Sequence, residues 1–250
     1  MVLKKYSRRG DGFMLRCGLQ ISSKLLDLGW VTLGLVLYFL VRGSVVDRQI
    51  QAAQNSEMII NFEKAAHLFF EPHLNHWTAS NELVSHIFNN VYFWFHFPVI
   101  AVTGIVLSLI ARPVFVLLRN SILLSGGVSL VIYWLFPVSP PRLVQGHDFV
   151  DTMDLFSQVS YQAQEFTPFV NQYAAMPSLH AGWALLLVLA IMSGFKSMIL
   201  RFFFILIFLF QLIAIICTGN HFWLDGLAGI AICLLAWGGA LLLRRMLYFG

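Results

Sequence analysis

Two histidines, one aspartate and one arginine lie at the margins of long apolar runs, and together they could carry out phosphate chemistry. His180 stands where one apolar run begins, and His221 and Asp225 are four residues apart where the last run begins. Arg142 follows two prolines at the end of another run. An ionisable side chain is costly to keep at the edge of a membrane span, so such residues usually have a function. We therefore expect these four side chains to form one site at one membrane surface.

His221 and Asp225 have the spacing of a base and the carboxylate that orients it. On a helix, residues four apart share a face, so Asp225 could accept a hydrogen bond from one imidazole nitrogen of His221. The other nitrogen would then carry the lone pair and could attack phosphorus. The same pair could also bind a metal ion, or Asp225 could simply cap a helix.

His180, Ser178 and Arg142 could complete this site. His180 could protonate a leaving alkoxide as a general acid. Ser178 stands at an expected helix start, where it could cap the helix or bind phosphate, and where free N–H groups attract an anion. Arg142 could hold two phosphate oxygens with its planar guanidinium group.

The other histidines are predicted to be residues of the membrane interface, because none of them belongs to a comparable cluster. His180 and His221 differ from them because both are expected on the same side of the membrane as an arginine and a carboxylate. The remaining histidines are His67, His73, His76, His86, His96 and His147.

The composition is that of an integral membrane protein. Of the 250 residues, 58% are hydrophobic and 11% are charged, whereas soluble domains carry about 25% charged residues. The basic residues are scattered near the ends of apolar runs, so nucleic-acid binding is not expected. The length suits a single integral membrane domain over residues 1–250, and no cysteine spacing suggests a metal site. We expect no cofactor.

Six apolar segments predict an all-α, polytopic fold, namely a bundle of six transmembrane helices. Each span must be a helix, because hydrocarbon offers the backbone no other hydrogen-bond partner. The fourth segment is short for a hydrocarbon core of about 30 Å. The segments cover residues 25–42, 90–110, 113–136, 179–195, 198–217 and 222–243.

The basic residues predict the orientation, because cytoplasmic loops carry an excess of Lys and Arg. With six spans, 12 of the 16 basic residues share one side with both termini, which we therefore assign to the cytoplasm. The loops 43–89, 137–178 and 218–221 then face the outer (periplasmic, extracellular or luminal) side, together with the expected site. The basic residues of the cytoplasmic side are Lys4, Lys5, Arg8, Arg9, Arg16, Lys24, Arg112, Arg119, Lys196, Arg201, Arg244 and Arg245.

The first outer loop is predicted to contain an amphipathic helix that lies in the membrane interface and is stopped by Pro72. Apolar residues recur at helical spacing from Met58 to Phe70. Such a helix could seal the ends of the spans or wall a lateral entrance for a lipid. A second short helix could cover residues 80–89. The opposite face of the first helix carries the charged residues Glu57, Glu63, Lys64 and Glu71.

The two motifs together resemble the type-2 phosphatidic acid phosphatase superfamily. The resemblance rests on Pro177-Ser178-Leu179-His180 and on the later His221-x-x-x-Asp225, and it covers roughly residues 113–243, the expected catalytic core. It implies six spans and an active site on the outer or luminal side. The runs Phe136–Leu143 and Ala174–His180 look most like the branch related to inositol phosphorylceramide synthase.

The resemblance also implies a role for each site residue. His221 would be the nucleophile, Asp225 its orienter, and His180 the acid that protonates the leaving group. Arg142 and Ser178 would hold the phosphate, and no metal would be required. The phosphohistidine intermediate would pass to water in a phosphatase or to an alcohol in a phosphotransferase.

Three positions depart from the pattern of the broad family. Leu135 and Ile215 stand where that pattern has a lysine and an arginine, and Leu179 stands where a glycine is common. The inositolphosphotransferase-like branch also lacks parts of the pattern, so these gaps favour that branch. A single arginine neutralises little charge, which favours a phosphodiester or monoester over a pyrophosphate. Asn171 and Asn220 could add hydrogen bonds.

The sequence therefore predicts a membrane lipid phosphatase or headgroup phosphotransferase that works at the outer leaflet. Its partners would be a lipid phosphate in the bilayer and, for transfer, an alcohol acceptor. Hydrolysis and transfer would use the same histidines, so both stay open. The alternative is a non-catalytic lipid-binding or transport protein with a phosphate-binding cluster, although the paired broken helices common in transporters are not visible in the sequence.

Overall fold

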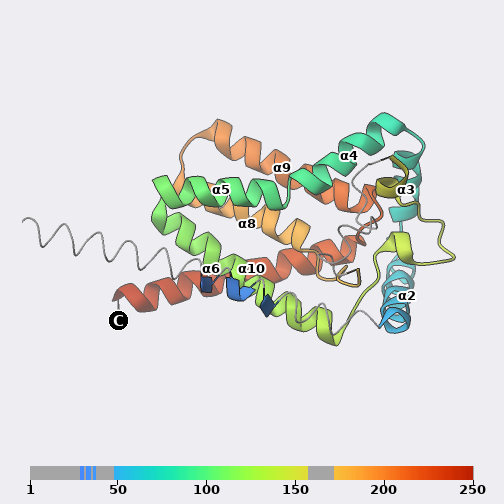
Figure 1. Ribbon diagram of the computed structural model, residues 1–250, viewed down its shortest axis with the longest axis horizontal. Helices are drawn as coiled ribbons and strands as arrows, with labels where there is room; N and C mark the ends of the chain where they lie inside the picture. The colour runs from blue at the N-terminus through green and yellow to red at the C-terminus, as the bar shows by residue number, and fades with distance from the viewer. Residues whose placement is uncertain (1–28, 31, 35, 38–47, 157–171, 250) are drawn as a thin grey trace, which may run out of the picture.

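The computed structural model describes residues 29–30, 32–34, 36–37, 48–156 and 172–249, and within these ranges the chain is helical and has no β-sheet (Figure 1). The predicted all-α class is thus confirmed for this part of the chain. The first predicted segment, 25–42, falls largely outside it. The elements are α2 (Gln49–Ala65), α3 (Glu71–Ala79), α4 (Glu82–Trp94), α5 (Phe97–Ile110), α6 (Arg112–Leu135), the 3-10 turn η1 (Pro141–Leu143), α7 (Thr152–Phe156), α8 (Leu179–Gly194), α9 (Met198–Cys217) and α10 (Trp223–Phe249).

Three of the described helices are long and apolar enough to cross a membrane, namely α6, α9 and the Trp223–Met246 part of α10. Helices α4 and α5 together could form a fourth span, bent by 42°. Pro98 explains the break, because it lies in the first turn of α5 and has no N–H to donate to the preceding turn. Three or four spans are fewer than six, so the six-span topology stays a prediction.

Helix α8 lies at the centre of the bundle and is the short fourth segment expected from the sequence. Its 16 residues rise about 24 Å, less than a hydrocarbon core of about 30 Å. It packs against α6, α9 and α10. Its buried side chains join those of the neighbouring helices in one core, and those of α8 are Leu186, Leu187, Val188, Ala190 and Ile191.

Two glycines let α8 and α10 approach each other closely. A Cβ atom added to Gly182 would lie 2.6 Å from the carbonyl oxygen of Gly229, and one added to Gly229 would lie 2.0 Å from the carbonyl oxygen of Ser178. Small residues at such a crossing allow contact between backbones. The start of α8 is therefore held directly against α10.

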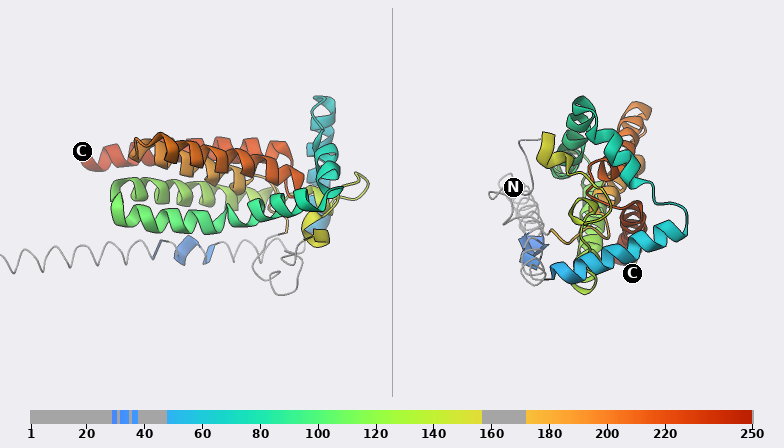
Figure 2. Two further views of the ribbon diagram at one scale, coloured as in Figure 1. Left: turned by 90° about the horizontal axis from the view of Figure 1, so that it is seen from above. Right: turned by 90° about the vertical axis from the view of Figure 1, so that its right-hand side faces the viewer.

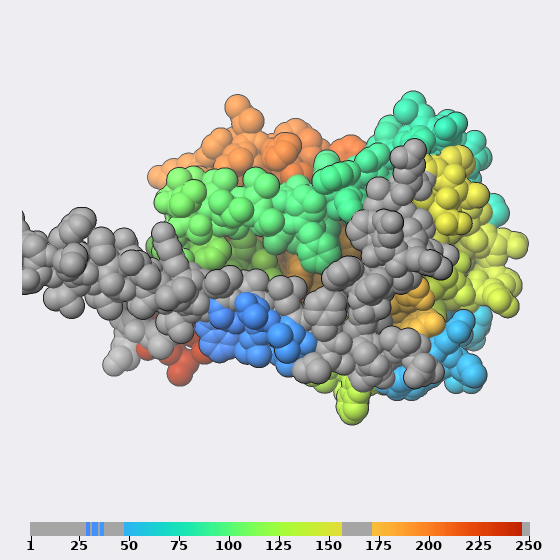
Figure 3. Space-filling model, in the orientation of Figure 1, coloured from blue at the N-terminus to red at the C-terminus, as the bar shows by residue number. Residues whose placement is uncertain are grey.

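The outer surface of the bundle is apolar along its length. The face formed by α5 is continuous in the space-filling view (Figure 3), and it exposes Val102, Ile105, Leu109 and Ile110. Helices α9 and α10 expose further large apolar side chains, among them Ile199 and Leu235. Exposed apolar side chains in such numbers are expected where a protein contacts lipid.

Helices α2 and α3 lie across the end of the bundle that is opposite the C-terminal end of α10 (Figure 2). The predicted boundary was wrong, because the first helix ends at Ala65 and Pro72 stands in the first turn of α3, where proline is tolerated. His67 separates the two helices with a positive φ of 57°.

The expected apolar and charged faces of this segment do not correspond to buried and exposed side chains. Met58 and Phe62 are 54% and 58% exposed, whereas Glu63 and Glu71 are completely buried. The two glutamates point toward the start of α10, where they accept backbone hydrogen bonds. The position of α2 in the membrane interface stays a prediction.

Candidate active site

The loops before η1, α8 and α10 meet at the end of the bundle that α2 and α3 cover. Val138 exchanges two backbone hydrogen bonds with residues 173–175, at 2.9 and 3.1 Å. Ser178 donates its backbone N–H to the carbonyl oxygen of Asp225 at 2.8 Å. These bonds bring together segments that are far apart in the sequence. Each of the segments carries or directly precedes a predicted site residue.

His221 lies just before α10, which begins at Trp223, so the predicted sharing of one helix face with Asp225 was wrong. The two side chains are nevertheless close, with Nδ1 of His221 3.5 Å from Oδ2 of Asp225. A nearer acceptor is the carbonyl oxygen of Ala175, at 2.8 Å from Nδ1. A carbonyl can only accept, so Nδ1 carries the proton and Nε2 keeps its lone pair.

Asp225 lies in the first turn of α10 and caps the start of this helix. Its Oδ2 atom accepts the backbone N–H of Phe222 at 2.9 Å, so the capping alternative for this carboxylate is realised. Its Oδ1 atom is buried and has no hydrogen-bond partner among the described residues. Asp225 therefore supports His221 in two ways, by proximity to Nδ1 and by holding the backbone beside it.

His180 is in the first turn of α8 and its ring lies between two other rings. The centroid of Tyr92 is 4.1 Å away on one side, and the centroid of His96 is 3.9 Å away on the other, with interplanar angles of 16° and 27°. The centroids of His180 and His221 are 5.5 Å apart. The two predicted catalytic histidines thus converge.

His96 belongs to this cluster, although the sequence placed it among the interfacial histidines. It is only 3% exposed and also stacks on Trp183, with 5.4 Å between ring centroids. It stands in the break between α4 and α5, where the chain turns and the side chain can point into the bundle. Pro98, two residues later, was the one signal in the sequence that marked this break.

Arg142 reaches the same end of the bundle but is already paired. Its backbone N–H donates to Gly219 O at 2.9 Å, and its side chain is 8% exposed. The Nε atom lies 3.2 Å from Oδ2 of Asp151, and Nη1 donates to Oδ1 of Asn220. The sequence did not indicate Asp151 as a site residue.

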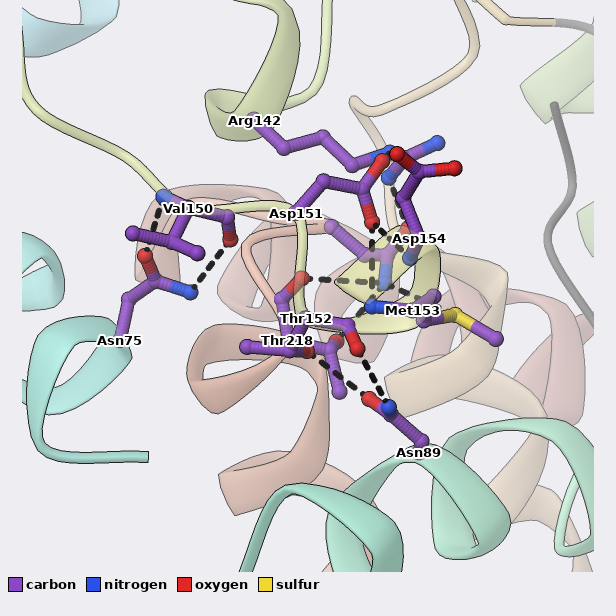
Figure 4. Close-up of polar contacts among 10 residues, drawn as sticks. Asn75, Asn89, Arg142, Val150, Asp151, Thr152, Met153, Asp154 and Thr218 are labelled. Carbon is purple, nitrogen blue, oxygen red and sulfur yellow. Dashed lines mark hydrogen bonds and ion pairs between the residues drawn. The ribbon is translucent and has the colours of Figure 1, made fainter. Parts of the chain in front are cut away.

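The segment that carries Asp151 is fixed from both sides by asparagines (Figure 4). Asn75 of α3 accepts the backbone N–H of Val150 at 2.7 Å and donates to its carbonyl oxygen at 3.0 Å. Asn89 of α4 donates to the carbonyl oxygen of Thr152 at 2.7 Å. Asp151 is therefore held against Arg142 by the fold.

Ser178 occupies the N-cap position of α8, but its hydroxyl makes no capping hydrogen bond. Its Oγ atom is buried and has no partner within the described residues, and the same holds for Nε2 of His180 and Nε2 of His221. Buried polar atoms are normally hydrogen-bonded. Three such atoms in one cluster, beside a helix N-terminus, suit an anion with several oxygens.

A cavity of about 590 Å³ opens beside Arg142. Its lining includes Arg142 and Ser139 but neither His180 nor His221, so it adjoins the histidine cluster rather than containing it. The other polar side chains that line it are Gln49, Gln145, Asp148, Gln172 and Tyr173.

Leu135 and Ile215 stand where the broad family pattern has cations. Leu135 is exposed at the end of α6, and Ile215 of α9 is buried among apolar side chains. Asn171 lies outside the described residues. Within the described ranges, no group of three or more His, Cys, Asp or Glu side chains could hold a metal ion.

Comparison with known proteins gave one result. The family model described as the PAP2 superfamily matches residues 57–239. The match begins within α2, well before the expected catalytic core, so Glu63, Glu71 and His96 lie inside it. No curated protein and no solved structure matches the chain.

Proposed function

Because the chain belongs to the PAP2 superfamily, whose members are phosphatases and phosphotransferases, we propose that it cleaves the phosphate ester of a membrane lipid through a phosphohistidine intermediate. The observation that carries this proposal is the pair of imidazoles 5.5 Å apart, each with a buried Nε2 atom that lacks a partner among the described residues.

His221 is the nucleophile in this proposal. The Ala175 carbonyl holds the proton on Nδ1, so the Nε2 lone pair is free to attack phosphorus. An Nε2–P bond forms, the P–O bond to the leaving group breaks, and His180 gives its proton to the leaving oxygen. In the second half, water or an alcohol attacks phosphorus, His180 takes the proton of the acceptor, and the N–P bond breaks.

Arg142 and Ser178 bind the phosphate. Arg142 supplies a guanidinium group whose orientation is fixed by Asn220, and Ser178 supplies a hydroxyl that has no hydrogen-bond partner among the described residues. Asp151 offsets much of the charge on Arg142. A site with so little net positive charge suits a phosphodiester or a monoester better than a pyrophosphate.

The inositol phosphorylceramide synthase-like branch is the part of the family that we favour. The apolar residues Leu135 and Ile215 support this choice, because they remove two cations that the broad pattern uses for phosphate. The polar cavity beside Arg142 could receive the headgroup of the lipid or the alcohol acceptor. Transfer and hydrolysis both fit the arrangement of the histidines.

We place the site on the outer side of the membrane and both termini in the cytoplasm. The support is the distribution of basic residues around the bundle. Arg112, Lys196, Arg201 and Arg244 belong to the end where α5 meets α6 and where α10 terminates, opposite the histidine cluster (Figure 1). A lipid headgroup at the other surface can then reach the site without leaving the bilayer.

The test is turnover of labelled phospholipids by the purified protein in proteoliposomes, with and without inositol, ceramide or diacylglycerol as acceptors. We expect phosphate release or headgroup transfer that is lost in His221→Ala. Binding of the lipids without turnover under every condition would favour the lipid-binding or transport alternative instead.

A further inference from the structure

Two buried glutamates hold the start of the helix that follows His221. Glu71 of α3 accepts the backbone N–H of Trp223 at 3.1 Å, and Glu63 of α2 accepts the backbone N–H of Leu224 at 3.4 Å. Both residues are completely buried. The first N–H groups of a helix have no partner within the helix, so these carboxyl groups supply what the helix itself cannot.

The preceding N–H group is held in the same way. Asp225 accepts the N–H of Phe222, so three consecutive N–H groups at the start of α10 each bind a different buried carboxyl group. A further bond joins the indole N–H of Trp223 to the carbonyl oxygen of Leu68, at 3.0 Å. His221 immediately precedes this turn, so its backbone is placed by these contacts.

The two glutamates share their environment with few charged groups. Asp225 is the other acidic group beside Glu63, and no Lys or Arg of the described ranges forms an ion pair with either glutamate. Lys64, the nearest cation in sequence, lies instead over the ring of Phe69, 5.2 Å from its centroid. In the part of the chain that the structure describes, no cation therefore neutralises the two carboxylates.

Burial and the neighbouring Glu71 carboxyl raise the pKa of Glu63 from 4.5 to about 10, and burial also raises the pKa of Glu71. The geometry agrees, because Oε2 of each glutamate is buried and has no hydrogen-bond partner among the described residues. The two carboxyl groups interact with each other, and a proton shared between them would supply the missing hydrogen bond. The single remaining negative charge is favourable at a helix N-terminus.

We propose that Glu63 and Glu71 form an acid pair that shares one proton and positions the nucleophile by fixing the first turn of α10. The positioning role rests on the proposed function of His221. When the shared proton is lost at high pH, two adjacent buried carboxylates repel each other. One of them must withdraw, so an N–H group of Trp223 or Leu224 loses its acceptor and the backbone beside His221 loosens.

The decisive variants are Glu63→Gln and Glu63→Ala, with turnover measured against pH. A glutamine at this position still accepts from Leu224 and donates an N–H to Glu71 in place of the shared proton, but it does not titrate. We expect Glu63→Gln to keep its kcat at neutral pH and to lose the part of the alkaline fall that lies near pH 10, where the shared proton of the wild type is released. Glu63→Ala should lose about 10²-fold in kcat, as expected for a displaced reacting group.

The matched control is Glu82→Gln, which removes an exposed carboxylate on α4 that pairs with His86. This variant should keep both the neutral rate and the alkaline fall. The proposal is overturned if Glu63→Gln is as inactive as Glu63→Ala, or if its alkaline fall matches that of the wild type.

A second measurement separates this proposal from the proposed function. A raised pKa means that the folded state keeps a proton that the unfolded state releases near pH 4.5, so stability should fall steadily between about pH 5 and pH 10. Thermal unfolding should show this slope in the wild type and in the inactive His221→Ala variant, and a flatter slope in Glu63→Gln. Equal slopes in all three proteins would contradict the acid pair even if no lipid is ever turned over.

Discussion

The imidazole rings of His96 and His180 are stacked 3.9 Å apart, and Tyr92 covers the opposite face of His180 at 4.1 Å. Stacking on both faces restricts the rotation of the His180 ring. The buried Nε2 atom of His180 has no hydrogen-bond partner among the described residues, and the ring centroid of His221 is 5.5 Å from that of His180. The geometry of the proposed acid is thus determined by residues of the bent α4–α5 pair.

This stacking predicts that His96→Ala lowers kcat more than His96→Phe does. Alanine removes the ring that supports His180, and a loss of about 10²-fold is expected for a misplaced reacting group. Phenylalanine restores a flat face and should recover most of the rate. Both variants should be compared at equal amounts of folded protein, judged by thermal unfolding. Equal loss in the two variants would mean that the imidazole of His96 itself takes part.

Asp225→Asn should reduce turnover by much less than the about 10⁴-fold loss that the same change causes in a serine-protease triad. The reason is that the carbonyl of Ala175 already holds the proton on Nδ1 of His221. An asparagine oxygen can still accept the N–H of Phe222, so the helix start should persist. Steady-state kinetics of this variant beside Asp225→Ala measure the effect, and a loss near 10⁴-fold in Asp225→Asn would show that the carboxylate, not the carbonyl, controls the tautomer.

Asp151→Asn should change the preference of the enzyme between phosphate charges. Removing this carboxylate leaves Arg142 with its full positive charge, so KM should fall more for a dianionic monoester than for a monoanionic diester. The control is Asp154→Asn, which removes a nearby exposed carboxylate and should leave the ratio of the two KM values unchanged. An unchanged ratio in Asp151→Asn would contradict the proposed effect of the Arg142–Asp151 pair.

Gly229→Ala should destabilise the protein and slow turnover, because the new Cβ atom would lie 2.0 Å from the carbonyl oxygen of Ser178. Overpacking of this kind typically costs about 1–3 kcal/mol. Gly238→Ala in the same helix is the matched control, since its Cβ atom would meet nothing within 4 Å. The control should unfold at the same temperature as the wild type or higher. Two variants that behave alike would contradict the close contact of α8 and α10.

The convergence of Arg142, His180 and His221 could be predicted from the sequence, because the alternation of apolar runs and loops sends all three to one end of a bundle. That argument needs only span counting and holds for the ends of α6, α8 and α10. Span counting could not predict which group accepts the hydrogen bond from Nδ1 of His221. The acceptor is the backbone carbonyl of Ala175, and the packing of two loops determines its position.

The incorrect helix boundary at Pro72 also depends on information that spacing does not contain. The sequence predicts a helix stop at Pro72, but proline is equally tolerated in the first turn of a helix, and spacing alone does not separate the two cases. Spacing places Glu63 and Glu71 opposite the apolar residues but does not show that they are buried. Their partners are N–H groups at the start of α10, which lie beside them because α2 and α3 cross the end of the bundle.

The most direct test of the central claim is to find the covalent intermediate. The purified protein would be mixed with a lipid labelled at its phosphorus, quenched in alkali to preserve phosphohistidine, digested and analysed by mass spectrometry. The account predicts a phosphorus adduct on His221 that appears within one turnover and is absent from His221→Ala. An adduct on another residue, or unimpaired turnover by His221→Ala, would contradict it.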